Sequence, residues 1–500
     1  MLFKNISRFL LPAAILLVLS APGLQAQQDH TDRISNAISQ QGIEFDIYFL
    51  ASDEFLGRDT GTQELKIASR YIATHFQTNG VQKPEGYDSY FQDVPLMRIS
   101  PPEQINLTVG QSSYHKDSDL IAMNTVRDSL NAPIVRLDYA TQEELEEYDV
   151  EGAIVFAGAG LPGQTSPQQF FMSSSEKMEW VRDAGGLALV ELYSSVQFPW
   201  QMLVNFLSGE QVVLDNEEEE EIPVLWMNAT DETALDNITE MNGLQAGLNI
   251  TGEHPEQFVS RNVIGIIEGA DPDLKDEYVL LGAHYDHTGV IPGQTEGNYI
   301  YNGARDNAVG TAGILAAATY LSENRPGRSV IFAAWTAEEV GLLGSGYYAD
   351  NPAVPLEETV YQLNIDGAGY NDITKVTVIG LGRTEADEEL KNAASAFELE
   401  AIADPVPEQN LFDRSDNVHF ARNGIPAPTY SMGLTAFDEE IQKFYHQVTD
   451  EPDTIDYEYV TKYIRSFVKA AFDIANRNEA PFWLPGDVYE EAGKELYGRD

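Results

Sequence analysis

The chain has 500 residues and a strongly acidic composition, with 80 Asp and Glu residues, 30 Lys and Arg residues and a formal net charge of −50. This charge argues against nucleic acids and anionic membranes as partners, because a polyphosphate ligand needs a basic surface. At 43% hydrophobic residues the chain can bury sizeable cores, and its length suggests about two to four domains. The absence of cysteine excludes disulfides, thiolate metal sites and cysteine nucleophiles, so any metal must be held by histidine and carboxylate side chains.

Residues 1–26 are predicted to form a secretory signal peptide. Lys4 and Arg8 precede the apolar run 9–19, and Ala26 provides a small residue at the cleavage site. The apolar run is far shorter than the ~20 residues that a membrane span needs, and no later stretch is long and apolar enough. We therefore expect an exported protein, periplasmic or secreted, with no membrane span in its mature form.

The mature chain is predicted to form one α/β domain interrupted by an insertion. Its first part is expected at residues 27–131 and its second part at residues 257–500. Residues 132–256 have a different texture, in which short strand-like runs are separated by polar loops. We interpret this segment as an inserted, β-rich domain.

The second part alternates predicted strands with predicted helices. Continuous apolar runs predict strands that are buried on both faces, at residues 278–283, 329–335 and 360–365. Helices are predicted at the Ala-rich segment 308–321 and at 457–475, where apolar residues recur on one face. Strands separated by helices predict a doubly wound, mostly parallel sheet.

Residues of the kinds that bind metals follow each of these buried strands: His284 and Asp286, Glu338 and Glu339, and Asp366, with Asp306 in the loop before the Ala-rich helix. Ligands of such sheets bind outside the carboxyl ends of the strands. Each residue alone has an ordinary explanation, such as a helix N-cap for Asp306 or a turn for Asp366. Adjacent glutamates at the end of a buried strand repel each other, however, unless a cation compensates or one is protonated. A divalent metal resolves this conflict.

Five short segments resemble the motifs of the co-catalytic, two-zinc aminopeptidases, a family that includes glutamate carboxypeptidase and the transferrin receptor ectodomain: residues 282–286, 303–308, 336–341, 364–366 and 445–446. The resemblance spans nearly the whole mature chain. It implies an α/β fold of the zinc-exopeptidase (phosphorylase/hydrolase-like) type. Residues 132–256 are similar to the protease-associated domain that is inserted in many members.

The resemblance implies a site for two Zn²⁺ ions, for which Co²⁺ or Mn²⁺ could substitute. Asp306 would bridge both ions. Glu339 and His446 would complete the ligands of one ion, and His284 and Asp366 those of the other.

Two further roles are implied by the same motifs. Glu338 would be the general base, and Asp286 would be the carboxylate that orients His284. Arg305, before the bridging aspartate, and Gly367, after Asp366, depart from the residues that many relatives carry. His287 and His419 receive no role and are expected at surface or loop positions.

The function predicted from these observations is that of an exported zinc aminopeptidase that acts on peptides. A carboxypeptidase of the same fold stays open, in which Arg305 or Arg414 would hold a C-terminal carboxylate. A glutaminyl-cyclase-like acyltransferase also stays open, although its relatives use one zinc and His284 favours two. A non-catalytic, receptor-like binding ectodomain is disfavoured because all five ligands and the base are retained. The oligomeric state is unknown from the sequence.

Overall fold

The computed structural model describes residues 22–499 except 125, 165–166, 195–198, 208, 216–220 and 231–240. The expected signal peptide lies outside the described residues apart from its last residues, which belong to helix α1 (Pro22–Ala37). Across the described parts of the chain, no helix combines the length and the apolar character that crossing a membrane requires.

The larger of two sheets contains nine strands in the order β16-β15-β17-β14-β12-β13-β11-β1-β8. These strands are β1 (Phe91–Ile99), β8 (Gln211–Leu214), β11 (Glu256–Ile267), β12 (Tyr278–His284), β13 (Ser329–Trp335), β14 (Thr359–Ile365), β15 (Lys375–Ile379), β16 (Glu400–Ala403) and β17 (Thr429–Met432). The strands β12, β13 and β14, which coincide with the three predicted apolar runs, pair in parallel, as do β14 and β17. Antiparallel pairing of β11, β1 and β8 extends one side, so the sheet is mixed.

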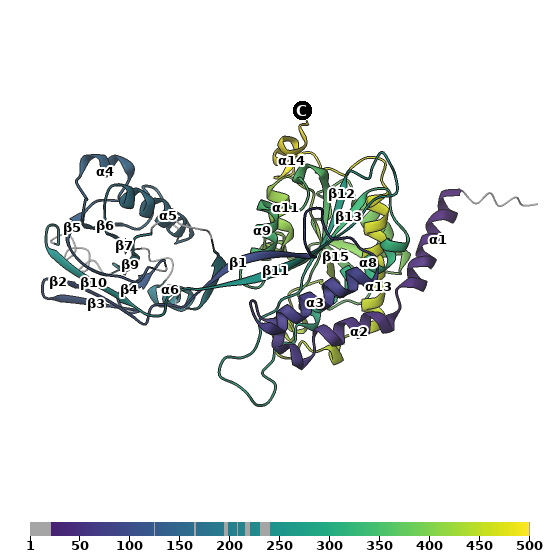
Figure 1. Cartoon of the computed structure of the whole chain (residues 1–500), viewed down its shortest axis with the longest axis horizontal. Helices are drawn as coiled ribbons and strands as arrows, with labels where there is room; N and C mark the ends of the chain where they lie inside the picture. Colours follow the sequence, from purple (N-terminus) through teal and green to yellow (C-terminus); the bar gives the residue numbers. More distant parts are fainter. Residues whose placement is uncertain are drawn as a thin grey trace, which may run out of the picture.

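Helices cover both faces of this sheet (Figure 1). They are α2 (Gln40–Leu50), α3 (Gln63–Thr78), α8 (Val309–Glu323), α9 (Leu343–Asp350), α10 (Asp387–Ala396), α11 (Asn417–Arg422), α12 (Glu439–Gln442), α13 (Tyr457–Ala475) and α14 (Glu490–Tyr497). Because successive side chains of a strand point to opposite faces, Val279 and Leu281 of β12 join the core under α8 and α13, whereas Leu280 joins the core beside α9 and α11.

Helix α13 illustrates how the sequence specifies these elements. Asp456 caps its first turn by accepting a hydrogen bond from the backbone N–H of Tyr459. Apolar residues then recur at helical spacing, and all of those predicted to share one face are buried: Val460, Ile464, Phe467, Ala471 and Ile474. The helix begins and ends where its pattern predicts.

The second sheet has eight strands in the order β3-β2-β10-β5-β6-β7-β9-β4. Its elements are β2 (Gln104–Val109), β3 (Ser112–His115), β4 (Leu120–Ala122), β5 (Ser129–Arg136), α4 (Gln142–Glu147), β6 (Ile154–Gly158), α5 (Pro167–Asp183), β7 (Ala188–Tyr193), α6 (Trp200–Leu207), β9 (Val224–Asn228) and β10 (Gln245–Thr251). It therefore includes strands that precede residue 132, where the sequence placed the start of the insertion. Buried and exposed side chains alternate along β2, and most side chains of β3 are exposed. Neither strand therefore contains a continuous apolar run.

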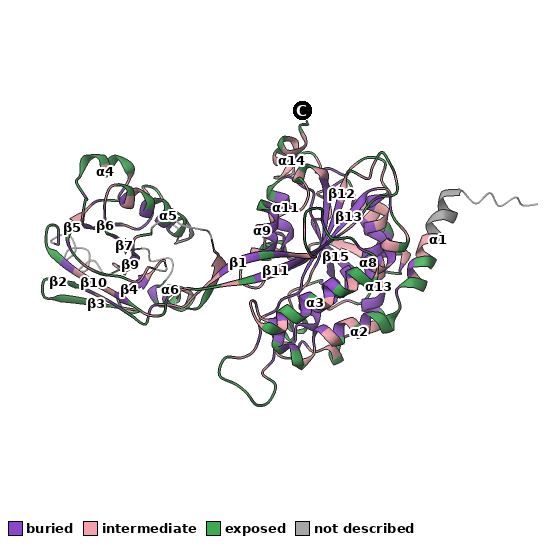
Figure 2. Cartoon of the chain, in the orientation of Figure 1, coloured by how far each residue is buried: buried purple, intermediate pink, exposed green. Residues whose placement is uncertain are grey.

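The long strands β1 and β11 connect the two sheets (Figure 1). Strands β1 and β11 pair antiparallel from Phe91 opposite Val263 to Arg98 opposite Glu256. The first residues of β11 are largely exposed, and its later part is buried within the larger sheet (Figure 2). The chain leaves the larger sheet along β1 and returns along β11, and between them β8, which lies within the predicted insertion, pairs with residues 96–99 of β1 in the larger sheet.

Candidate metal centre

The predicted site residues come together at one edge of the larger sheet. His284 is the last residue of β12, Glu338 and Glu339 lie just beyond β13, and Asp366 directly follows β14. Because these strands are parallel, their carboxyl ends meet at the same edge. The other two predicted ligands lie outside the strand ends. Asp306 lies in the one-turn helical segment η2 (Ala304–Ala308) before α8, and His446 follows α12.

Asp306 lies between two imidazoles. Its Oδ1 is 3.2 Å from Nε2 of His284, and its Oδ2 is 3.2 Å from Nε2 of His446. The peptide bond between Asp306 and Asn307 is cis. A carboxylate whose two oxygens face two separate nitrogen ligands can ligate two ions at once.

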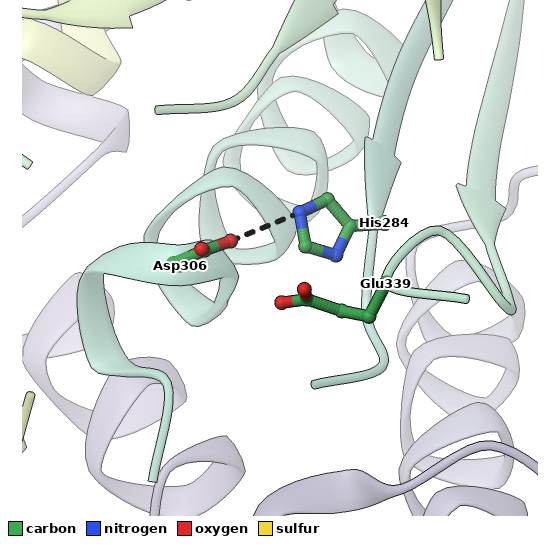
Figure 3. A group of neighbouring side chains, drawn as sticks. All are labelled: His284, Asp306 and Glu339. Carbon is green, nitrogen blue, oxygen red and sulfur yellow. Dashed lines mark ion pairs between the residues drawn. The ribbon is translucent and has the colours of Figure 1, made fainter. Parts of the chain in front are cut away.

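The other predicted ligands surround this carboxylate. Ligand atoms of His284, Asp306 and Glu339 lie within 4.8 Å of one another, as do those of His284, Glu338 and Asp366. Nε2 of His284 is 3.3 Å from Oδ1 of Asp366. Figure 3 shows the side chains of His284, Asp306 and Glu339 converging from separate elements.

Nε2 of His446 is 3.1 Å from Oε2 of Glu339. All five residues expected to bind metal are therefore gathered in one place, with Glu338 beside them.

The acidic side chains gathered in the site favour the binding of a cation. Although burial opposes charging of the His284 imidazole, the carboxylates around it raise its pKa well above the usual range. Burial likewise opposes protonation of His446, but hydrogen bonds to Asp306 and Glu339 raise its pKa to about 10. Burial and acidic neighbours raise the pKa of Glu338 well above that of an ordinary glutamate. A bound cation would compensate these buried carboxylates, and a set of imidazole nitrogens and carboxylate oxygens suits zinc.

Asp286 contacts the site in a different way from the one predicted. Nδ1 of His284 is 3.2 Å from the backbone carbonyl oxygen of Asp286 and 3.9 Å from its carboxylate, so the imidazole donates to the carbonyl. The carboxylate accepts hydrogen bonds from the backbone N–H groups of Glu338, at 3.2 Å, and Glu339, at 3.3 Å. Asp286 thus orients His284 through its backbone and fixes the two glutamates through its side chain.

Two residues of the site were missed from the sequence. His287, expected at the surface or in a loop, is buried, and its Nδ1 lies 2.5 Å from Oε1 of Glu339. Ser415 donates a hydrogen bond of 2.5 Å to Oδ2 of Asp366. His419, also expected at a surface or loop position, is partly buried in α11. The available signal for His287 was its position, directly beyond the segment that carries His284 and Asp286.

Arg58 forms hydrogen bonds to several loops around the site. Its guanidinium is buried and donates to the backbone carbonyl oxygens of Leu50, Tyr285, Asn302 and Gly303. Tyr285 lies between His284, the last residue of β12, and Asp286. Gly303 directly precedes η2. The buried cation thereby joins the end of β12 to the loop that carries Asp306.

Arg305 is committed to the protein itself. It is buried, its Nη1 donates to Oδ1 of Asp450 at 2.9 Å, and its Nη2 donates to the carbonyl oxygen of Thr454 at 2.7 Å. Its guanidinium also lies over the ring of Phe444, 3.7 Å from the centroid. This engagement leaves Arg305 poorly placed to bind a substrate carboxylate.

A cavity of about 320 Å³ is lined by four of the five predicted metal ligands, Asp306, Glu339, Asp366 and His446. One part of its wall is apolar and is formed by Ile379, Leu411, Leu434 and Phe437. Arg414 is exposed and also lines the cavity, where its Nη2 donates to the hydroxyl of Tyr445 at 3.3 Å. The Tyr445 ring stacks on His446, with centroids 4.1 Å apart.

Residues 262–471 match the model of Peptidase family M28. The chain is 25% identical over 402 residues to Aminopeptidase YwaD of Bacillus subtilis (strain 168), covering 78% of this chain and 77% of that protein. It is 37% identical over 127 residues to Aminopeptidase NAALADL1 of Mus musculus, covering 24% of this chain and 15% of that protein.

The fold resembles that of an aminopeptidase from Aneurinibacillus sp. strain AM-1. The TM-score is 0.55 at 19% sequence identity, and the match covers 91% of this chain and 98% of that one. The family match and the similarity to aminopeptidases identify a metallopeptidase, and its architecture is mixed α/β. The match of residues 262–471 to the model of Peptidase family M28 agrees with the resemblance seen in the motifs.

Proposed function

We propose that the protein is an exported, two-zinc aminopeptidase that removes N-terminal residues from peptides. The observation that carries this proposal is the placement of Asp306 between His284 and His446, with Glu338 at the edge of the same cavity. The aminopeptidase names of the relatives YwaD and NAALADL1 support it.

Zinc ions held by His284, Asp306, Glu339, Asp366 and His446 would polarise the scissile carbonyl and lower the pKa of the attacking water. Glu338 moves the proton. Its carboxyl lines the cavity beside the predicted ligands, so it would take a proton from the attacking water and give it to the nitrogen of the departing amine. Asp286 keeps Glu338 in place through the hydrogen bond to its backbone N–H.

The cavity suits a peptide whose first side chain is apolar. The wall of Ile379, Leu411, Leu434 and Phe437 offers an apolar surface that such a side chain would cover. The acidic side chains that also line the cavity would attract a free ammonium group. We therefore place leucine-like residues among the preferred N-terminal residues.

A carboxypeptidase remains the second candidate because Arg414 lines the cavity with its side chain exposed. The two activities are separated by blocking one end of the substrate at a time. An aminopeptidase hydrolyses leucine p-nitroanilide and leucyl-glycinamide but fails on their N-acetylated forms. A carboxypeptidase tolerates the acetyl group and requires the free carboxylate. Conversion of an N-terminal glutamine to pyroglutamate without peptide hydrolysis would support the cyclase instead.

Export and domain organisation complete the proposal. Residues 1–26 would be removed on export, leaving a catalytic domain built from two parts of the chain. The segment between them would be a protease-associated domain that begins near β2 rather than at residue 132, as the strand order of the second sheet supports. Sequencing the N-terminus of the protein recovered outside the cytoplasm tests the cleavage, which should follow Ala26.

A further inference from the structure

We propose that His287 is a positioning residue that holds Glu339 in its metal-binding orientation. The inference rests on the proposed function, because it assigns His287 a part in zinc binding.

The hydrogen bond between the two side chains is short and buried. Nδ1 of His287 lies 2.5 Å from Oε1 of Glu339, and the exposed fractions of the two side chains are 1% and 6%. A carboxylate only accepts, so the Nδ1–H of His287 is the donor. The other oxygen, Oε2, then faces Nε2 of His446 at 3.1 Å. His287 thus binds Oε1 of Glu339, while Oε2 is directed at His446.

The backbone fixes the imidazole from two sides. The N–H of His287 donates to the carbonyl oxygen of Arg58 at 3.1 Å. On the other side, a Cβ atom at Gly303 would come within 2.6 Å of the His287 ring, and Gly303 has a positive φ of 59°. Only a residue without a side chain lets the ring lie so close to the loop before Asp306.

No other hydrogen bond competes for the ring among the described residues. Nε2 of His287 is buried and has no hydrogen-bond partner there. Among the residues that the structure describes, the imidazole therefore makes one hydrogen bond, the bond to Glu339, and it is through this bond that the ring contacts the predicted ligands.

Glu339 needs such a restraint because it is surrounded by like charge. Its backbone N–H is held by Asp286, but its side chain lies beside Asp306 and follows directly on Glu338. Repulsion would turn an unrestrained Glu339 carboxylate away from Asp306. Loss of His287 should therefore weaken the ion bound by Glu339 and His446, and leave the ion bound by His284 and Asp366 largely unaffected.

Three substitutions separate positioning from simple packing. His287→Asn places an amide N–H where Nδ1 stands, so the hydrogen bond to Glu339 is retained. His287→Gln is equally polar but places its amide at the position of Nε2, away from Glu339. His287→Leu fills the space without a donor. His75→Leu is the matched control, because His75 is a partly buried histidine of α3 outside the site.

The readouts are zinc affinity, by competition with a chelator of known affinity, and kcat and KM for leucine p-nitroanilide. In His287→Leu and His287→Gln we expect the affinity for one of two zinc ions to fall by about ten- to a hundredfold, with kcat reduced at limiting zinc and KM little changed. His287→Asn should stay within about threefold of the wild type, and His75→Leu should match the wild type.

Wild-type zinc affinity in His287→Leu, or equal rescue by Asn and Gln, would overturn the inference. If His287→Leu does not fold, the comparison of Asn with Gln decides alone. Failure of the proposed function gives a different result, since the wild type itself would then bind no zinc and leave leucine p-nitroanilide intact.

Discussion

Nδ1 of His284 lies 3.2 Å from the backbone carbonyl oxygen of Asp286. A carbonyl oxygen only accepts hydrogen bonds, so in the neutral ring the proton sits on Nδ1 and the lone pair of Nε2 points toward Asp306 and Asp366. The backbone of Asp286 therefore selects the tautomer that a metal ligand needs. Its carboxylate is left free to fix the loop that carries the two glutamates.

The first prediction concerns that carboxylate. Asp286→Ala should lower kcat for leucine p-nitroanilide more than it raises KM, because the N–H groups of Glu338 and Glu339 lose the acceptor that places them. The unsatisfied buried N–H groups should also lower the free energy of unfolding of the zinc-free protein by roughly 1–3 kcal/mol. Urea denaturation and steady-state kinetics measure the two effects.

The control for this variant is Thr60→Val, because Thr60 donates to the same carboxylate at 3.2 Å from outside the glutamate loop. It should have a smaller effect on kcat. An Asp286→Ala enzyme with unchanged kcat would show that the carboxylate does not position the base.

The second prediction concerns Ser415, which contacts the predicted ligand Asp366. Ser415 donates to Oδ2 of Asp366 at 2.5 Å and accepts from the side-chain amide of Asn364 at 2.7 Å. Ser415→Ala should weaken the ion bound by His284 and Asp366 by about tenfold, since the partner that orients this ligand is lost. Zinc titration should therefore show weaker binding of this ion and little change for the ion bound by Glu339 and His446, which is the reverse of the result expected for His287→Leu.

Ser322→Ala in α8 is the matched control, because its hydroxyl bonds only within the helix, to the carbonyl oxygen of Thr319. Identical zinc affinities for Ser415→Ala and this control would contradict the assignment of Ser415 as a support for Asp366.

The third prediction is a pH dependence far from the metal centre. Asp46 of α2 accepts a hydrogen bond of 2.5 Å from the hydroxyl of Tyr71 in α3. Burial raises the pKa of Asp46 from 3.8 to about 6, despite that hydrogen bond. Between these values the folded protein binds more protons than the unfolded chain, so stability falls as pH rises from about 4 to about 6 and stays lower above it.

Asp46→Asn removes this titration and keeps an oxygen that Tyr71 can donate to. The variant should equal the wild type near pH 4 and exceed it at pH 8 by about 2 kcal/mol in the free energy of unfolding, from ~1.4 kcal/mol for each pKa unit reduced for partial solvent exposure. Denaturation curves at the two pH values measure the difference. A gap that does not change with pH would refute this account of Asp46.

Much of the fold followed from the sequence because its strands are buried on both faces. Strands β12, β13 and β14 are continuous apolar runs, and the polar residues beyond them meet because parallel strands end together. The short strands β2 and β3 lack such runs, so the second sheet begins earlier than expected. A half-exposed strand depends on its neighbours in space, which local sequence does not specify.

The site likewise contains residues that the sequence pattern places and residues that it does not. His284, Glu338, Glu339 and Asp366 are placed by strand ends, whereas His446 follows a short helix and was found by resemblance alone. The burial of His287 depends on its contact with Glu339 and on Gly303, residues remote in the chain. No periodic pattern records such contacts, so the sequence did not indicate that this histidine, which lies in the loop after β12, is buried.

The most direct test of the central claim compares the wild type with Glu338→Gln, measuring bound zinc and hydrolysis of leucine p-nitroanilide on the same preparations. We predict two zinc ions per chain in both proteins, with kcat lower by about 10²–10⁴-fold in the variant because only the base is lost. A variant that retains wild-type turnover, or one that loses zinc together with activity, would contradict the assignment of Glu338 as the general base beside a two-zinc site.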